Sequence, residues 1–217
     1  RKKDGDDWLI NKIMDKAGNK GTGNWTTIAT AQLGVPSTMI ASALFARYTS
    51  FYKEERLTAS INIESYSSKL DLTNEDILRA YQFARIINHY QGFKLINEAS
   101  KSYKWDLNLS ELARIWTNGC IIKSNLMIEL VSVFKTTNNM LTNKNIIKQI
   151  NTLKPSVKKV VSQCVLNELS ISSLSESINF LNSFSIAKSS ANLIQAQRDY
   201  FGAHTYQRID DNSGEFY

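Results

Sequence analysis

The sequence predicts an all-α protein of long antiparallel helices followed by an extended C-terminal tail. Three observations support this fold class. Apolar residues recur with a helical period over long segments, no segment alternates strictly between apolar and polar residues, and the 217 residues include only two prolines. Helices are expected over residues 7–17, 26–33, 36–56, 73–103, 110–134, 143–169, 172–185 and 191–201.

Start and stop signals set the bounds of the first three helices. Asp6 and Asp7 favour the start of the first helix, and Gly18 favours its end. Gly34 ends the second helix, and Pro36 opens the third. The apolar face expected for the first helix consists of Leu9, Ile10, Ile13 and Met14.

The long central helix has the clearest start. Thr73, with Asp76 three residues later, predicts a capping box, and the serine-rich stretch 60–74 before it reads as a surface connection. Ser110 opens the following helix, and Pro155 is expected to interrupt or kink the one after that.

The C-terminal segment differs from the rest, so we divide the chain into a helical domain (1–201) and a tail (202–217). Gly202 breaks the last helix, which lets the chain fold back and bring Arg198 and His204 to one ligand. The alternative is that Arg198 pairs with a neighbouring residue and His204 is an ordinary surface residue.

The formal charge is +6, from 26 basic and 20 acidic residues. The basic residues are scattered, which favours a solvated basic surface over a nucleic-acid site. No apolar run is long enough to span a bilayer, so no membrane partner is expected. The sequence starts with Arg1 instead of Met, so we expect either a processed product or a piece of a longer protein.

The cysteines and histidines do not predict a metal site. Cys120 and Cys164 stand in apolar contexts typical of buried free thiols in a reducing compartment, and no ligand cluster accompanies His89 or His204. His89 lies inside the central helix without a base or nucleophile one turn away, so we interpret it as structural.

The stretch from Asn19 to Trp25 (Asn-Lys-Gly-Thr-Gly-Asn-Trp) carries glycines, a lysine and a hydroxyl ahead of a helix. Backbone N–H groups that converge at a helix start form an anion pocket. The alternative is a glycine that ends a helix, followed by an ordinary loop. The stretch matches neither a P-loop nor a dinucleotide-binding fingerprint.

Several blocks of this sequence together resemble the C-terminal half of the 6-phosphogluconate dehydrogenase family, in order and over nearly the whole chain. The most specific are Lys-Gly-Thr-Gly at 20–23 and Gln-Arg-Asp-Tyr-Phe-Gly-Ala-His-Thr-Tyr at 197–206. The others are Leu-Gly-Val-Pro at 33–36, Phe-Ala-Arg-Tyr at 45–48, Trp-Asp-Leu-Asn at 105–108 and Gly-Cys-Ile-Ile at 119–122.

The resemblance implies a helical domain that follows an N-terminal Rossmann domain in a cytoplasmic homodimer. Such an enzyme converts 6-phosphogluconate to ribulose 5-phosphate and CO2 with NADP, in the pentose phosphate pathway. It implies that Lys20, Thr22 and Arg47 bind the substrate phosphate, together with Arg198 and His204 from the other subunit's exchanged tail. The family's catalytic lysine and glutamate, and most of its NADP site, lie upstream of the match. We therefore assign no catalytic residue and expect the chain alone to be inactive.

Two departures from the family pattern fall near this site. Asn24 stands where the family commonly has lysine, and Thr117-Asn118 stand where it has Arg-Gly, so the local charge differs. The alternatives are a related hydroxyacid dehydrogenase, against which Lys20 and Arg47 argue, and a non-catalytic helical binding or assembly module. A nucleic-acid binder would be recognised by an affinity that falls steeply with salt.

Overall fold

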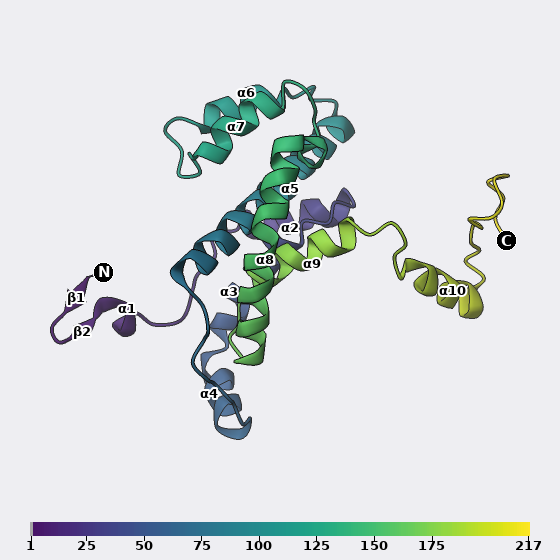
Figure 1. Cartoon of the computed structure of the whole chain (residues 1–217). Coiled ribbons are helices and arrows are strands. Elements are labelled where there is room, and N and C mark those ends of the chain that lie inside the picture. Colours follow the sequence, from purple (N-terminus) through teal and green to yellow (C-terminus); the bar gives the residue numbers. More distant parts are fainter. Residues whose placement is uncertain (1) are drawn as a thin grey trace. The chain divides into compact units, whose positions relative to one another are not determined.

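Helices make up nearly all of the regular secondary structure, as Figure 1 shows for a computed structural model that describes residues 2–217. The strands are β1 (Lys3–Asp4) and β2 (Asp7–Trp8), which pair as an antiparallel hairpin. The helices are α1 (Leu9–Lys12), α2 (Thr22–Gln32), α3 (Thr38–Phe51), α4 (Lys53–Asn62), α5 (Asn74–Tyr103), α6 (Leu109–Trp116), α7 (Asn125–Val133), the 3-10 turn η1 (Met140–Thr142), α8 (Lys144–Leu166), α9 (Ser172–Phe184) and α10 (Ala191–Gly202). The all-α prediction is therefore confirmed.

The chain divides into two units, residues 2–179 and 180–217, with the division inside α9. The domain bounds predicted from the sequence stay a prediction. None of the helices in residues 2–217 is long and apolar enough to cross a membrane.

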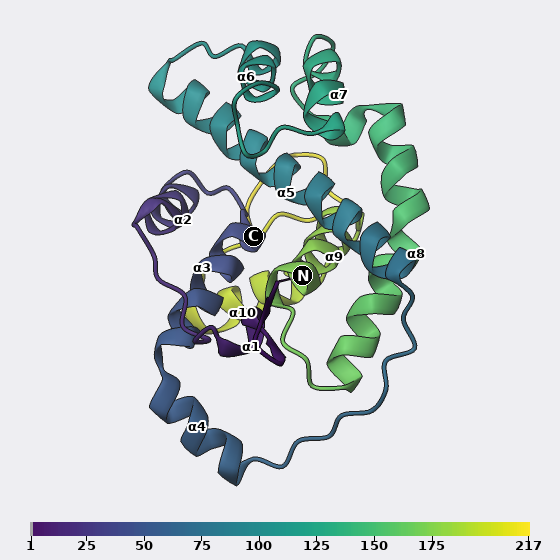
Figure 2. The same cartoon turned by 90° about the vertical axis from the view of Figure 1, so that its left-hand side faces the viewer.

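The core of the first unit forms around α5. This helix packs against α8 and α3, and α5 and α8 lie side by side in both views (Figures 1 and 2). The side chains of α5 that are almost fully enclosed are Ala80, Phe83, Ile86, Ile87, Tyr90, Gln91 and Phe93. Phe93 contacts Phe134 with ring centroids 4.5 Å apart, so the same core continues to the end of α7.

The predicted start of α5 is confirmed. The hydroxyl of Thr73 accepts a hydrogen bond from the Asp76 N–H at 3.1 Å, and the Asp76 carboxylate accepts one from the Thr73 N–H at 3.0 Å. Figure 2 shows the preceding connection as an extended segment between α4 and α5. It is tied to the end of α8, because Ser68 donates from its N–H to Asn167 Oδ1 at 2.6 Å.

The helix predicted over residues 7–17 is wrong. Only α1 forms, and Ile10, Ile13 and Met14 are 71%, 58% and 71% exposed. An apolar stripe stabilises a helix only where another element covers it, and this short segment has no such cover within its unit. Ile13, which follows α1, is already extended, with a ψ of 129°.

Two other predicted helices are each split in two. The segment 36–56 breaks at Tyr52, whose ψ of 51° ends α3 before α4 continues to Asn62. The segment 110–134 breaks after Trp116, where Gly119 takes a φ of 65° and Ser124 caps the new helix α7. In both cases the apolar period runs across a turn that periodicity cannot reveal.

The remaining bounds differ by a few residues. Asn108, not Ser110, caps α6, and buried Ser110 instead donates to the Val131 carbonyl at 2.8 Å. Pro155 lies inside α8, which is assigned as one continuous helix and ends at Leu166, three residues before the predicted end. The predicted extents of α9 and α10 agree with the structure to within one residue.

Candidate anion-binding site

The glycine loop before α2 takes its shape from Gly21 and Asn19. Gly21 has a φ of 98°, a conformation that side-chain-bearing residues rarely adopt, and its N–H donates to Asn19 Oδ1 at 2.8 Å. Gly23 lies in the first turn of α2, where a Cβ atom would be 3.4 Å from Leu44 Cδ1. The first glycine therefore allows the turn, and the second lets α2 approach α3 closely.

The N-terminus of α2 is open to a ligand. The helix begins at Thr22, four residues earlier than expected, and no side chain caps it. The first helical hydrogen bond runs from the Trp25 N–H to the Gly21 carbonyl at 3.0 Å. The N–H groups of residues 22–24 therefore lack helical partners. With no acidic residue in that turn, the positive end of the helix dipole is uncompensated.

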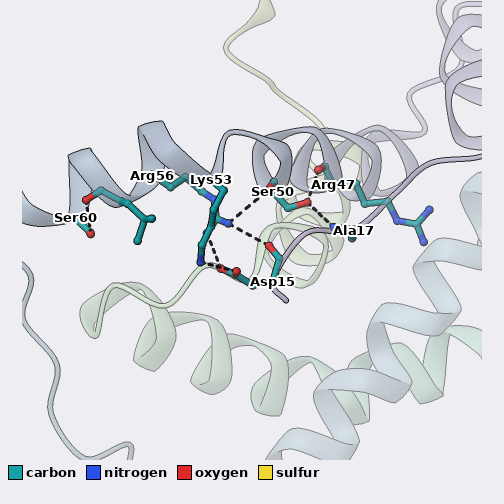
Figure 3. A network of polar contacts seen from close by, with 8 residues as sticks. Asp15, Ala17, Arg47, Ser50, Lys53, Arg56 and Ser60 are labelled. Carbon is teal, nitrogen blue, oxygen red and sulfur yellow. Dashed lines mark hydrogen bonds and ion pairs between the residues drawn. The ribbon is translucent and has the colours of Figure 1, made fainter. Parts of the chain in front are cut away.

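Arg47 and Lys20 supply positive charge beside this helix start. The guanidinium of Arg47 extends away from the polar network that its backbone joins (Figure 3). Among residues 2–217 neither the Arg47 guanidinium nor the Lys20 ammonium forms a hydrogen bond or an ion pair, and both residues are exposed. Both cations are therefore available to an anion from outside the chain.

A cavity of about 670 Å³ lies in the first unit between α2, α3 and α5. Its walls include Thr22, Gly23 and Arg47, whereas Lys20 does not line it. The other walls are Met39, Ile40, Ala43, Leu44, Tyr81, Ala84, Arg85, Asn88, His89, Ile121, Ile122, Ser173 and Leu174. Because two arginines and no carboxylate line this cavity, it favours a negatively charged ligand.

The cavity also holds polar residues that the sequence interpretation did not assign to a site, namely Arg85, Asn88 and His89. His89 Nδ1 lies 2.7 Å from the Arg85 carbonyl oxygen, which accepts its proton and leaves Nε2 as the acceptor. Burial lowers the pKa of His89, so the ring is neutral at pH 7. The spacing i, i+3, i+4 places the three residues on one face of α5 and was the available signal.

His204 lies in the second unit, just beyond the end of α10. Ala203 adopts a left-handed φ of 47°, and the chain turns so that the His204 ring lies against Gly202. A Cβ atom at Gly202 would be 2.9 Å from Cδ2 and Nε2 of that ring. The helix ends at Gly202, close to the predicted break, but the left-handed residue that turns the chain is Ala203. The glycine instead makes room for the histidine.

Arg198 lies on α10, and its guanidinium forms one hydrogen bond within residues 2–217, from Nη1 to Gln195 Oε1 at 3.3 Å. Asp199 does not pair with it, because its carboxylate accepts the N–H of Thr205 at 2.8 Å. Arg198 and His204 thus belong to one unit, and Lys20, Thr22 and Arg47 belong to the other. The assignment of all five to one site stays a prediction.

Residues 2–217 contain no group of three or more His, Cys, Asp or Glu side chains placed to hold a metal ion. Cys120 and Cys164 are free, and Cys164 is buried as expected, whereas Cys120 is half-buried. We assign no metal to any side chain of the described chain.

The chain matches one protein family over its whole length. The sequence profile of the 6-phosphogluconate dehydrogenase C-terminal domain covers residues 1–217. The decarboxylating 6-phosphogluconate dehydrogenase of Lactococcus lactis is 38% identical to this chain, over 95% of this chain and 45% of the relative. That of Drosophila melanogaster is also 38% identical, over 99% of this chain and 46% of the relative. The Dictyostelium discoideum enzyme is 36% identical, over 98% and 45%.

A solved structure agrees with these sequence relatives. The 6-phosphogluconate dehydrogenase of Plasmodium falciparum has been solved alone, with its cofactor NADP+ and with its substrate 6-phosphogluconate. It superposes with a TM-score of 0.90 at 32% identity, over 97% of this chain and 47% of that one. The chain thus spans about half the length of the relatives it matches, and it belongs to the 6-phosphogluconate dehydrogenase C-terminal domain family.

Proposed function

We propose that this chain is the substrate-binding and dimerisation part of an NADP-dependent, decarboxylating 6-phosphogluconate dehydrogenase. Such an enzyme oxidises 6-phosphogluconate at carbon 3 and releases CO2 to give ribulose 5-phosphate. The relatives at 38% identity carry that activity in chains about twice as long. We assign the general acid and base to the half of the relatives' sequence that this chain does not cover.

The observation that carries the proposal is the open start of α2 beside an unpaired arginine. A phosphate dianion takes hydrogen bonds from backbone N–H groups at a helix N-terminus and from the planar fork of an arginine. Thr22 adds a hydroxyl, Arg47 the fork and Lys20 a point charge two residues before Thr22. The absence of carboxylates from the cavity walls leaves this charge uncompensated.

The remaining phosphate ligands come, in our proposal, from the second subunit of a homodimer. Arg198 and His204 are exposed and have no carboxylate partner among residues 180–217. The helix that carries Arg198 also exposes large apolar side chains, with Leu193 72% and Phe201 70% exposed. Such a surface favours association, and an exchanged tail would bury it.

The NADP cofactor is not assigned to any residue of this chain. A dinucleotide site needs a glycine loop between a parallel strand and a helix. The loop before α2 follows residues 13–20, which form neither helix nor strand, and the strands among residues 2–217 are the two-residue β1 and β2. The residues present therefore do not fit NADP.

Substitution of Arg47 tests the phosphate site in the full-length enzyme that contains this chain. Because a hydrogen bond to a charged group contributes about 1.5–3 kcal/mol, Arg47→Ala is expected to raise the KM for 6-phosphogluconate by roughly 10- to 150-fold. The KM for NADP should stay near its original value. Arg114→Ala is the matched control, since Arg114 is exposed and pairs with Glu111 at 2.7 Å, away from the cavity.

An unchanged KM for 6-phosphogluconate in Arg47→Ala would remove Arg47 from the site and contradict the proposal. A second measurement uses the 217-residue chain alone, which we expect not to reduce NADP with 6-phosphogluconate. Turnover by this chain alone would show that it carries the catalytic groups after all.

A further inference from the structure

Residues 15–17, which lead into the glycine loop, form hydrogen bonds to α3, the helix of Arg47, and to α4 (Figure 3). Asp15 accepts a hydrogen bond from Lys53 Nζ at 2.6 Å and one from Arg56 Nη1 at 3.0 Å. The two cations hold the pKa of Asp15 at about 2, with the Lys53 hydrogen bond as the larger cause. This contact anchors the upstream end of the segment to α4.

A second contact lies one turn beyond Arg47. The Ser50 hydroxyl accepts a hydrogen bond from the Ala17 N–H at 2.9 Å and donates one to the Arg47 carbonyl at 2.6 Å (Figure 3). One side chain thus joins the backbone just before the glycine loop to the backbone of Arg47 itself.

The third contact involves Asn19 and Tyr48, the neighbours in sequence of Lys20 and Arg47. Asn19 uses both ends of its amide, since Oδ1 accepts the Gly21 N–H at 2.8 Å and Nδ2 donates to the Tyr48 hydroxyl at 3.1 Å. Asn19 and Tyr48 are half-buried, so this bond is partly shielded from water. The turn that opens α2 is therefore linked directly to α3, next to Arg47.

These links matter because a loop with glycines at 18, 21 and 23 has many conformations available. Ordering such a loop on binding costs conformational entropy, and a loop that is already ordered binds more tightly. The Tyr48 and Ser50 contacts lie one and three residues beyond Arg47, so they fix the spacing between the loop and that arginine. Phosphate binding by several groups at once depends on this spacing.

We propose that Asn19 and Tyr48 are positioning residues, which hold the glycine loop at the spacing from Arg47 that fits the substrate phosphate. They act through Lys20, Thr22 and Arg47 and need not touch the substrate. This inference rests on the proposed function, because it presumes that those three residues bind the phosphate. It adds two residues that the sequence interpretation did not include in the site.

The test uses Tyr48→Phe and Asn19→Ala in the full-length enzyme. Tyr48→Phe removes one hydroxyl and keeps the ring, so the thermal unfolding midpoint should stay nearly unchanged. Loss of one positioning hydrogen bond should raise the KM for 6-phosphogluconate about 3- to 10-fold, with kcat and the KM for NADP unchanged. The Ki of inorganic phosphate, as a competitive inhibitor, should rise by the same factor.

Tyr52→Phe is the matched control, because Tyr52 lies four residues further along and its hydroxyl has no hydrogen-bond partner among residues 2–217. It should change neither KM nor Ki. A purely structural role of Tyr48 would lower kcat and stability together and leave the Ki of phosphate unchanged. That result would overturn the inference.

A double-mutant cycle separates this inference from the function beneath it. If Tyr48 acts through Arg47, Tyr48→Phe should have no further effect on the Ki of phosphate in the Arg47→Ala background. Fully multiplicative effects would overturn the positioning role. If Arg47→Ala weakens binding and Tyr48→Phe does not, only the positioning role fails, whereas a neutral Arg47→Ala refutes the phosphate site and the inference together.

Discussion

The helices α5 and α10 have similar local patterns but opposite surroundings. Eleven residues of α5 are buried, and none of α10 is. Ile87 on α5 is fully enclosed, whereas Leu193 and Ile194 on α10 are 72% and 59% exposed. An apolar helical face therefore predicts that a helix forms, but the element that covers the face has to come from elsewhere in the fold or from another molecule.

The segment after α10 takes its conformation from polar contacts. Tyr206 and Tyr217 exchange two backbone hydrogen bonds, of 3.1 and 2.9 Å, and their rings stack with centroids 6.2 Å apart. Inside this closed loop Arg208 forms an ion pair with Asp210 at 2.6 Å. The core around α5 is stabilised by burial, whereas this segment is stabilised by local hydrogen bonds, which water can replace more easily.

The largest expected difference between the two helices is in the cost of removing an apolar side chain. Ile87→Ala should lower the free energy of unfolding by about 2–5 kcal/mol, because it leaves a cavity in a closed core. Leu193→Ala should change it by less than about 0.5 kcal/mol in the monomer. Urea unfolding at a concentration where sedimentation shows monomers provides the measurement.

A comparable loss in Leu193→Ala under those conditions would mean that the face of α10 is covered within one chain. If the loss appears only at concentrations where the protein is dimeric, α10 is covered by a second subunit, as the exchanged tail requires.

A smaller difference is expected at the helix starts. Thr73 caps α5 through a reciprocal hydrogen-bond pair with Asp76, whereas the side chain of Ser190 makes no capping bond to α10. Thr73→Ala should therefore destabilise the protein by about 0.5–2 kcal/mol, and Ser190→Ala should be close to neutral. Equal effects in chemical denaturation would show that the capping box adds nothing to stability.

The sequence predicted an element correctly where the residues that determine it are close together in the chain. The start of α5 was predictable because Thr73 and Asp76 are three residues apart. The end of α10 was predictable because Gly202 stands there, although Ala203 takes the left-handed turn. The helix expected over 7–17 failed because its apolar face has no cover within its unit, and the break after Trp116 falls in a turn with no strong breaker beyond Gly119.

The candidate site was predictable only in part for the same reason. Thr22 and Arg47 came from sequence blocks that resemble a known family, and both line the cavity. The spacing of Arg85 and His89 places them on one face of α5, but they line the cavity only because α5 packs beside α3. The Asn19 contact with Tyr48 joins residues 29 positions apart and could not be inferred from spacing either.

The smallest expected difference between α5 and α10 is in how their stability responds to low pH. The backbone N–H of Thr73, followed by Lys159 and the Thr73 hydroxyl, lowers the pKa of Asp76 from 3.8 to about 2. Since the folded pKa lies below the ordinary value, Asp76 contributes its full stability above pH 3.8, and this is lost as the pH falls through about 2. The first turn of α10 has no acidic residue and should show no such loss.

Asp76→Asn should remove this contribution, so the variant should lose less unfolding free energy than the parent between pH 4 and pH 2. In the same pH range, hydrogen exchange at the first amides of α5 should accelerate more in the parent protein than in Asp76→Asn. The first amides of α10 should show only the intrinsic change of exchange rate with pH. Parallel pH profiles for the parent and Asp76→Asn would show that the capping carboxylate does not set the acid limit of α5. Asp76→Asn also removes the ion pair of 3.0 Å between Asp76 and Lys159, so that result would exclude both the cap and the ion pair. Any difference in acid response between the two helix starts would then need another cause.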